Sequence, residues 1–118
     1  MLTEIKQKLE EIDPNVFYGM ADKSLADREW NYIVFGRRNL SAAPNKTGYT
    51  TYYWIAIVRE DFVPEGTEIS VINKMLEIDG MRLSSTNAQY EYIMKPNTNT
   101  VIEVLTLEFY KADKRAVT

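Results

Sequence analysis

The sequence predicts an α+β domain in which two helices pack on a mainly antiparallel sheet, in the order α-β-β-β-α-β-β. Two segments carry apolar residues at helical spacing, and five others have the aromatic, β-branched or alternating composition of strands. Successive strand segments are joined as hairpins, which favours antiparallel pairing. No internal repeat or linker interrupts residues 1–118, so we assign the whole chain to a single domain.

The first helix is predicted at the N-terminus, where charged residues lie opposite an apolar stripe formed by Leu2, Ile5, Leu9 and Ile12. Pro14 disfavours a helical conformation of the residue before it, so this helix should end near Asp13. Residues 15–19 form a short apolar strand segment, and residues 30–35 form a clearer one. The charged residues 22–29 between them are typical of a solvated connection.

A long hairpin loop is predicted from Gly36 to Gly48, because this segment is rich in Asn, Ser, Pro and Arg. Loops of this length are usually functional or mobile. The strand that follows, residues 49–58, carries apolar or aromatic side chains on both faces. Two helices are too few to cover both faces, so we expect part of this strand surface to contact another protein chain.

The second helix is predicted after Gly66, with Gly80 as its C-terminal cap and a buried stripe formed by Ile69, Ile72, Met75 and Leu76. Two strands follow, near residues 90–94 and 100–110, and a turn at residues 95–99 joins them. An alternative topology uses the second helix as a crossover, which would make the strands on either side of it parallel. The charged residues 111–115 are predicted to form a frayed tail.

Composition excludes several kinds of chemistry. The chain has no cysteine and no histidine, so it lacks thiolate nucleophiles, disulfides, the commonest general base and the commonest transition-metal ligand. Its formal charge of −3 gives no general attraction to nucleic acid or to an anionic membrane. We also find no leader peptide and no apolar run long enough to span a bilayer, so the cytoplasm is the expected compartment.

We expect a non-enzymatic protein without metal or cofactor, because catalytic motifs are absent. The five glycines stand apart, without the spacing of a phosphate-binding loop. A carboxylate enzyme remains one hypothesis, and it predicts a cleft in which Glu60, Asp61 or Glu65 has a raised pKa. Such a cluster more often belongs to a solvated loop.

A module that binds nucleic acid is a further hypothesis. Arg37 and Arg38 lie near four strand tyrosines, Tyr32, Tyr49, Tyr52 and Tyr53. The rings could stack on bases while the guanidinium groups contact phosphates. The acidic net charge instead favours cross-strand packing of the tyrosines. In a third interpretation, the arginines bind the acidic Glu60-Asp61 corner of a neighbouring subunit in a ring.

The order of segments resembles a known family. A helix precedes a strand leading to Trp30-Asn-Tyr-Ile-Val-Phe-Gly-Arg-Arg-Asn39, a long loop, the strand Tyr52-Tyr-Trp-Ile-Ala-Ile-Val58, a helix and a final hairpin. This arrangement is similar to that of the small tail-completion proteins, or tail terminators, of long-tailed bacteriophages and prophages. The resemblance covers nearly the whole chain and rests on element order, size and strand composition. Related neck and minor tail proteins share these features.

The resemblance implies a structural role. Such proteins form a ring, often of six subunits, that caps the tail tube protein and provides the surface that joins the head-completion or connector protein. They assemble in the host cytoplasm and then belong to the virion. From their chemistry and expected exposure we predict eight contact residues: Arg37, Arg38, Asn39 and Lys46 in the long loop, Tyr52 and Trp54 in the strand, and Lys95 and Asn97 in the last turn.

Overall fold

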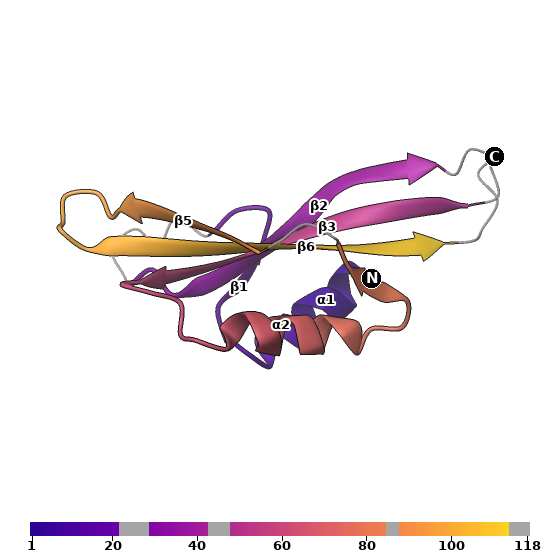
Figure 1. The fold of residues 1–118 in the computed structure, drawn as a ribbon, viewed down its shortest axis with the longest axis horizontal. Coiled ribbons are helices and arrows are strands. Elements are labelled where there is room, and N and C mark those ends of the chain that lie inside the picture. The colour runs from indigo at the N-terminus through magenta and orange to yellow at the C-terminus, as the bar shows by residue number, and fades with distance from the viewer. Residues whose placement is uncertain (22–28, 43–47, 85–87, 114–118) are drawn as a thin grey trace.

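The computed structural model describes residues 1–21, 29–42, 48–84 and 88–113 (Figure 1). Its elements in chain order are α1 (Leu2–Glu10), β1 (Val16–Tyr18), β2 (Tyr32–Ala42), β3 (Tyr49–Glu60), α2 (Thr67–Leu76), β4 (Met81–Leu83), β5 (Gln89–Met94) and β6 (Val101–Asp113). The predicted α+β class and the order of helices and longer strands are confirmed. The three-residue strand β4 is an addition that the sequence did not indicate.

The three longest strands, β2, β3 and β6, form the centre of the sheet and pair antiparallel. β1 pairs parallel with β2, whereas β4 and β5 both pair antiparallel with β6. β3 occupies one edge of β6, so β4 and β5 must both pair with its opposite edge. They lie one after the other along that edge. The strands on either side of α2 therefore run parallel, as in the alternative topology, but β6 separates them.

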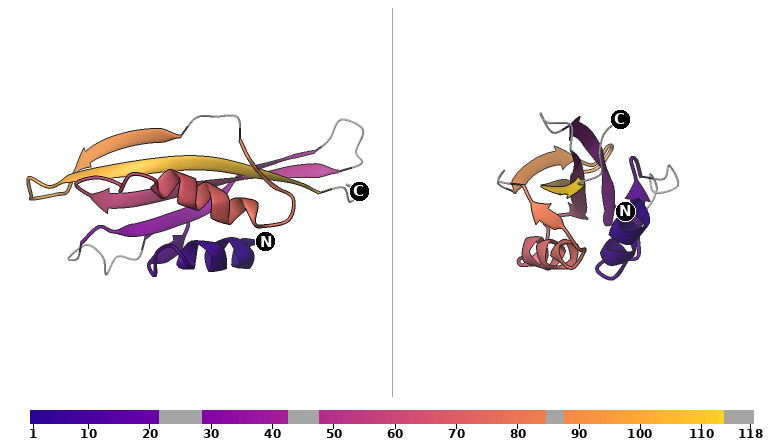
Figure 2. Two further views of the ribbon diagram at one scale, coloured as in Figure 1. Left: turned by 60° about the horizontal axis from the view of Figure 1, so that its bottom comes forward. Right: turned by 90° about the vertical axis from the view of Figure 1, so that its right-hand side faces the viewer.

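Both helices lie on the same face of the sheet, as the two views of Figure 2 show. Ile5 and Leu9 of α1 are fully buried, as their spacing predicted, and the helix ends close to the expected position. They pack on a core that the central strands supply, with Phe35, Ile55, Ile57, Leu105, Leu107 and Phe109 among its members. This face of the sheet holds the hydrophobic core.

The predicted buried stripe of α2 is partly wrong. Met75 is fully buried and Ile72 packs at the edge of the core, but Ile69 and Leu76 are exposed. The buried face instead follows Val71, Met75 and, just beyond the helix, Ile78. Both stripes have helical spacing, so periodicity alone could not distinguish them, and the position of the sheet decides which one is buried.

The predicted cap of α2 is also wrong. The helix ends at Leu76, and Glu77 occupies the C-cap position with ordinary helical backbone angles. Gly80 lies further along and has a φ of +82°, the left-handed conformation that glycine adopts without steric cost. Its role is therefore to turn the chain into β4 rather than to end the helix.

The loop predicted from Gly36 to Gly48 is wrong over its first half. β2 continues through Ala42 and pairs with β3, with one irregularity between Arg37 and Asn39. Arg37, Arg38 and Asn39 are therefore strand residues, because the long partner strand β3 outweighs the weak strand propensity of this polar segment. Lys46 lies outside the described residues.

The frayed tail predicted at residues 111–115 is wrong over its first part. Residues 111–113 belong to β6 and pair with β3. β3 supplies a backbone partner for these charged residues, which local composition alone would place in a tail. Residues 114–118, and most of the charged connection predicted at residues 22–29, lie outside the described residues.

The central strands extend beyond both helices and form an arm (Figure 1). We define the arm as residues 36–42 of β2, 49–54 of β3 and 108–113 of β6, which pair with one another. The molecule is elongated as a result, with extents of 52 × 27 × 23 Å. Within the described residues β1 pairs with β2 only as far as Phe35, so the outer edge of the arm lacks a partner strand.

Candidate functional site

The two faces of β3 have different environments. Tyr53, Ile55 and Ile57 face the helices and are buried. On the opposite face Tyr52 and Trp54 are half-buried, and the Tyr52 ring lies 5.9 Å from that of Tyr110 on β6. Neither face is thus a plain solvent-exposed surface, and the two predicted contact residues of this strand lie on the face away from the helices.

A hollow of about 590 Å³ lies beneath the arm, on the side of the sheet that carries the helices. The start of α1 forms one wall through Met1, Leu2 and Thr3, and the other surfaces come from the arm, through Arg37, Arg38, Asn39, Leu40, Tyr49, Thr51 and Tyr53. The structure therefore brings three predicted site residues together with an N-terminal segment that sequence reasoning did not include. No local signal links these segments, because they meet only in the folded chain.

The two arginines of the arm already have partners. Arg37 Nε donates a hydrogen bond to the Tyr18 hydroxyl at 3.0 Å, and Arg38 Nε lies 2.8 Å from Glu108 Oε1. Arg37 shares the hollow with Tyr49 and Tyr53, but Tyr52 lies on the opposite face of the sheet. The tyrosines and arginines of the predicted nucleic-acid platform are therefore divided between two faces.

The remaining predicted residues, Lys95 and Asn97, lie in the turn between β5 and β6, at the end of the molecule away from the arm. Lys95 Nζ is 2.6 Å from Glu60 Oε1 and 6.0 Å from the centre of the Trp30 ring. Asn97 is exposed and has a φ of 62°, which suits the turn. The described site residues thus fall into two regions, the arm, which holds five of them, and the turn between β5 and β6.

The predicted carboxylate site is not supported by the environment of Glu60. The hydrogen bond from Lys95 lowers the pKa of Glu60, whereas an acid catalyst of that kind requires a raised pKa. Among the residues that the structure describes, no group of three acidic side chains is placed to hold a metal ion. Glu60 is best explained as the partner of Lys95.

The contact between Lys95 and Glu60 predicts a pH-dependent stability. Because the pKa of Glu60 is lowered in the folded protein, its stabilising effect is present above the usual glutamate value of 4.5 and is lost as the pH falls through the lowered value. Lys95→Met should therefore lower the free energy of unfolding at neutral pH. The difference in stability between the variant and the unmodified protein should disappear in acid. Urea unfolding of both proteins across this pH range measures the difference, and a constant difference would contradict the prediction.

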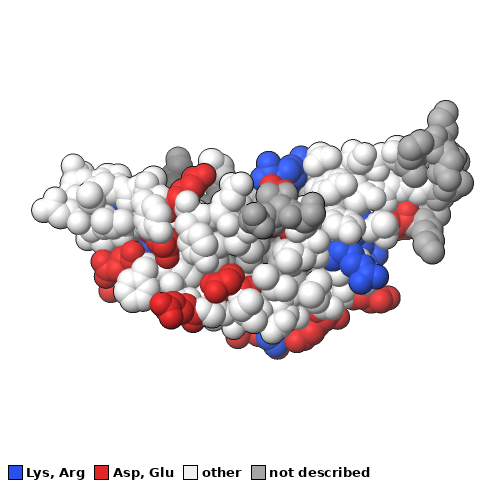
Figure 3. All heavy atoms as spheres, viewed as in Figure 1, with Lys and Arg blue, Asp and Glu red and all other residues white. Residues whose placement is uncertain are grey.

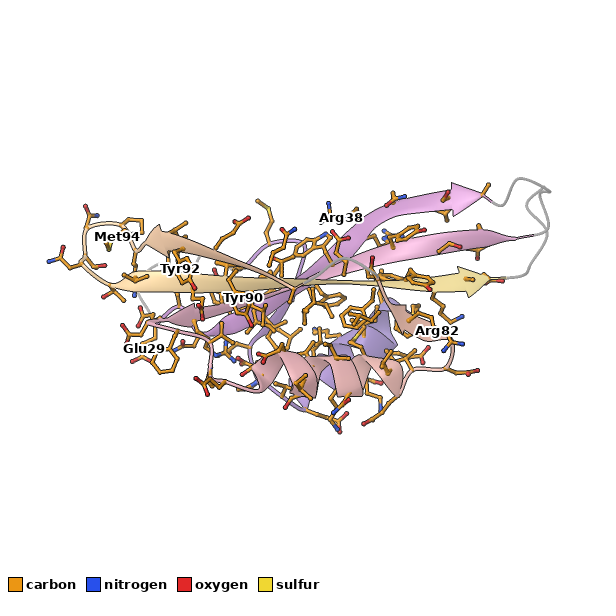
Figure 4. The ribbon with its side chains drawn as sticks, viewed as in Figure 1. Glu29, Arg38, Arg82, Tyr90, Tyr92 and Met94 are labelled. Carbon is orange, nitrogen blue, oxygen red and sulfur yellow. The ribbon has the colours of Figure 1, made fainter. Side chains whose placement is uncertain are left out.

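Strand β5 was predicted, but its exposure was not. All six of its residues are exposed, including Tyr90, Tyr92, Ile93 and Met94 with exposed fractions of 46–62%. Figure 4 shows Tyr90, Tyr92 and Met94 along this strand at one end of the molecule. β5 pairs with β6 on one side, and no described strand pairs with its other edge. The alternation of Gln, Tyr and Glu is typical of a half-buried strand, so nothing in it indicates exposure on both faces.

Charged side chains are unevenly distributed over the face shown in Figure 3. Carboxylates gather toward the end that carries β5 and over the helices, and lysines and arginines are visible near the middle of the face and at its lower edge, while some carboxylates also lie toward the arm. Glu91 on β5 and Asp61 and Glu65 in the connection between β3 and α2 are exposed, as are Arg37 and Arg38 on the arm. β5 therefore carries an exposed carboxylate, and the arm carries two exposed arginines, of which Arg38 is paired with Glu108.

Comparison with known proteins does not place the chain in a family. No family model matches the sequence, and no curated protein matches it. Within the described residues, no helix is long and apolar enough to cross a membrane. The function is therefore inferred from the geometry of this chain and from the resemblance in its order of elements.

Proposed function

We propose that the protein is a non-enzymatic structural subunit that assembles with further copies of itself into a ring. The observation that carries this proposal is β5, an edge strand with four exposed apolar or aromatic side chains. An exposed edge of this kind is a hazard for a monomer, because it can pair with other chains without control. A closed ring removes the hazard by covering every such edge.

The finer proposal is that this ring is a tail terminator of a long-tailed phage or prophage, with another neck or minor tail protein as the alternative. Its support is the similar order of elements, together with an arm whose extended surface suits contact with further proteins. In this role the ring caps the tail tube protein and binds the head-completion or connector protein. It assembles in the host cytoplasm and is then part of the virion.

The assembly can be tested by measuring the mass in solution by light scattering over a wide range of protein concentration. We expect a ring-sized species that Met94→Lys abolishes, because a lysine at this position of β5 would be buried without a partner in the interface. Ile69→Lys on α2 is the matched control, since Ile69 is 56% exposed and Met94 is 55% exposed. The control should assemble as the unmodified protein does.

Two results would contradict the proposal. A protein that stays monomeric up to millimolar concentration does not assemble with itself as proposed. Assembly that survives Met94→Lys but is lost in Ile69→Lys would move the interface from β5 to α2. Circular dichroism of each variant should match that of the unmodified protein, because both side chains are exposed and neither supports the core.

A further inference from the structure

Two of the strand edges that lack a partner within the described residues lie at opposite ends of the molecule. One is the outer edge of β5, and the other is the edge of β2 along the arm, residues 36–42. Figure 4 shows them through Tyr92 and Met94 at one end and Arg38 toward the other. An unpaired edge presents backbone donors and acceptors that another strand can satisfy.

The directions of these two strands suit a continuous sheet. β2 is antiparallel to β3, β3 is antiparallel to β6, and β6 is antiparallel to β5, so β2 and β5 are antiparallel within one subunit. A neighbouring copy in the same orientation would therefore present its β2 edge antiparallel to β5. Antiparallel addition needs no reversal of either subunit, and the same contact can repeat from copy to copy until a ring closes.

The side chains of β5 suit the hollow beneath the arm. Tyr90 and Tyr92 lie opposite Leu105 and Glu103 of β6, which face the helices, so alternate residues of β5 point to that side. The hollow opens on the same side of the sheet and borders the free edge of β2. When the sheet continues between copies, these tyrosines and Met94 approach the hollow of the next subunit.

Charge also favours this pairing over pairing of β5 with itself. Glu91 is exposed on β5, and the arm carries the exposed Arg37, whose partner Tyr18 is uncharged, and the exposed Arg38, which also pairs with Glu108. Opposite charges across an interface orient the partners and exclude wrong ones. A two-fold pairing of β5 with another β5 centred on Glu91 would instead bring two like charges together, and no two-fold pairing of β5 uses the arginines or the hollow.

We propose that β5 of one subunit adds as an antiparallel strand to the arm of the next copy, with Tyr90, Tyr92 and Met94 entering the hollow beside Leu40. This interface rests on the proposed function, because it is the contact that would close the ring. Both edges are used once in each subunit, so the contact is heterologous and leaves no free strand edge of the arm or of β5.

Cysteine cross-linking tests the interface directly, because the natural chain has no cysteine. Ile93 of β5 and Asn39 of the arm lie on the face of the sheet away from the helices. The double variant Ile93→Cys with Asn39→Cys should form a ladder of disulfide-linked oligomers under mild oxidation. A second double variant, Ile93→Cys with Ser41→Cys, covers the neighbouring register. Ile69→Cys with Asn39→Cys is the control and should give no ladder.

The outcomes separate this inference from the proposed function. A ladder from either β5 and arm pair, absent in the control, supports the interface. If light scattering finds assemblies but neither pair gives a ladder, the interface is wrong and the proposed function stands. Dimers from Ile93→Cys alone would show two-fold pairing of β5 and would also overturn the proposed interface between β5 and the arm. If no assembly is found at any concentration, the proposed function is wrong and the interface is wrong with it.

Discussion

Replacement of Asp13 by alanine is expected to lower the free energy of unfolding by about 3–5 kcal/mol. Asp13 Oδ2 lies 2.6 Å from Arg59 Nη2, and their side chains are 7% and 16% exposed. Asp13 Oδ1 also accepts a hydrogen bond from the backbone N–H of Asn15 at 2.8 Å. The substitution would leave the Arg59 charge in a nearly buried site without its partner and would detach the turn after α1 from β3.

Urea unfolding followed by tryptophan fluorescence measures this loss of unfolding free energy. Two further variants separate the effect of burial and the effect of charge. Glu11→Ala is the matched control, because Glu11 pairs with Lys74 at 3.2 Å on the surface, where such pairs contribute about 0–1 kcal/mol. Asp13→Asn can keep an oxygen for the Asn15 N–H but removes the charge. We expect the loss of unfolding free energy in Asp13→Asn to lie between the losses in Asp13→Ala and Glu11→Ala. Equal effects for Asp13→Ala and Glu11→Ala would show that burial of the pair is unimportant.

Local sequence signals predicted α1 well, because one apolar stripe and Pro14 define both its buried face and its end. α2 was harder, because Ile69 and Val71 begin two alternative stripes of equal quality. Only the position of the sheet selects the second stripe. The extension of β2 through residues 36–42 could not be predicted from its polar composition, because pairing with β3 is a tertiary effect that outweighs local propensity.

The candidate site was predicted only in part, for a similar reason. Arg37, Arg38 and Asn39 were selected for their chemistry, and they do lie together at the arm. Their location in a loop was wrong, and their neighbours at the N-terminus are distant in sequence. β5 is exposed because no described element covers it. The alternating pattern of residues within the strand carries no information about which other elements cover it.

The arm itself depends on a close contact between Gly36 and Trp54, which are direct partners in neighbouring strands. A Cβ atom at residue 36 would lie only 2.7 Å from Trp54 Cζ2 and 2.8 Å from Trp54 Cε2. Glycine within a strand often marks such a close approach, and an aromatic ring on the partner strand can cover it. Gly36→Ala is therefore expected to destabilise the protein by about 1–3 kcal/mol, because the rigid indole ring must move.

A double-mutant cycle with Trp54→Ala tests this explanation, because it measures the coupling between the two residues. Without the indole, the new methyl group has space, and alanine is favoured over glycine in a strand by about 0.5–1 kcal/mol. Gly36→Ala should then be neutral or stabilising in the Trp54→Ala background, as measured by urea unfolding. Equal destabilisation in both backgrounds would mean that residue 36 requires glycine for its backbone and not for the ring. The cycle thus decides whether the arm is held by ring packing or by backbone freedom next to its irregularity.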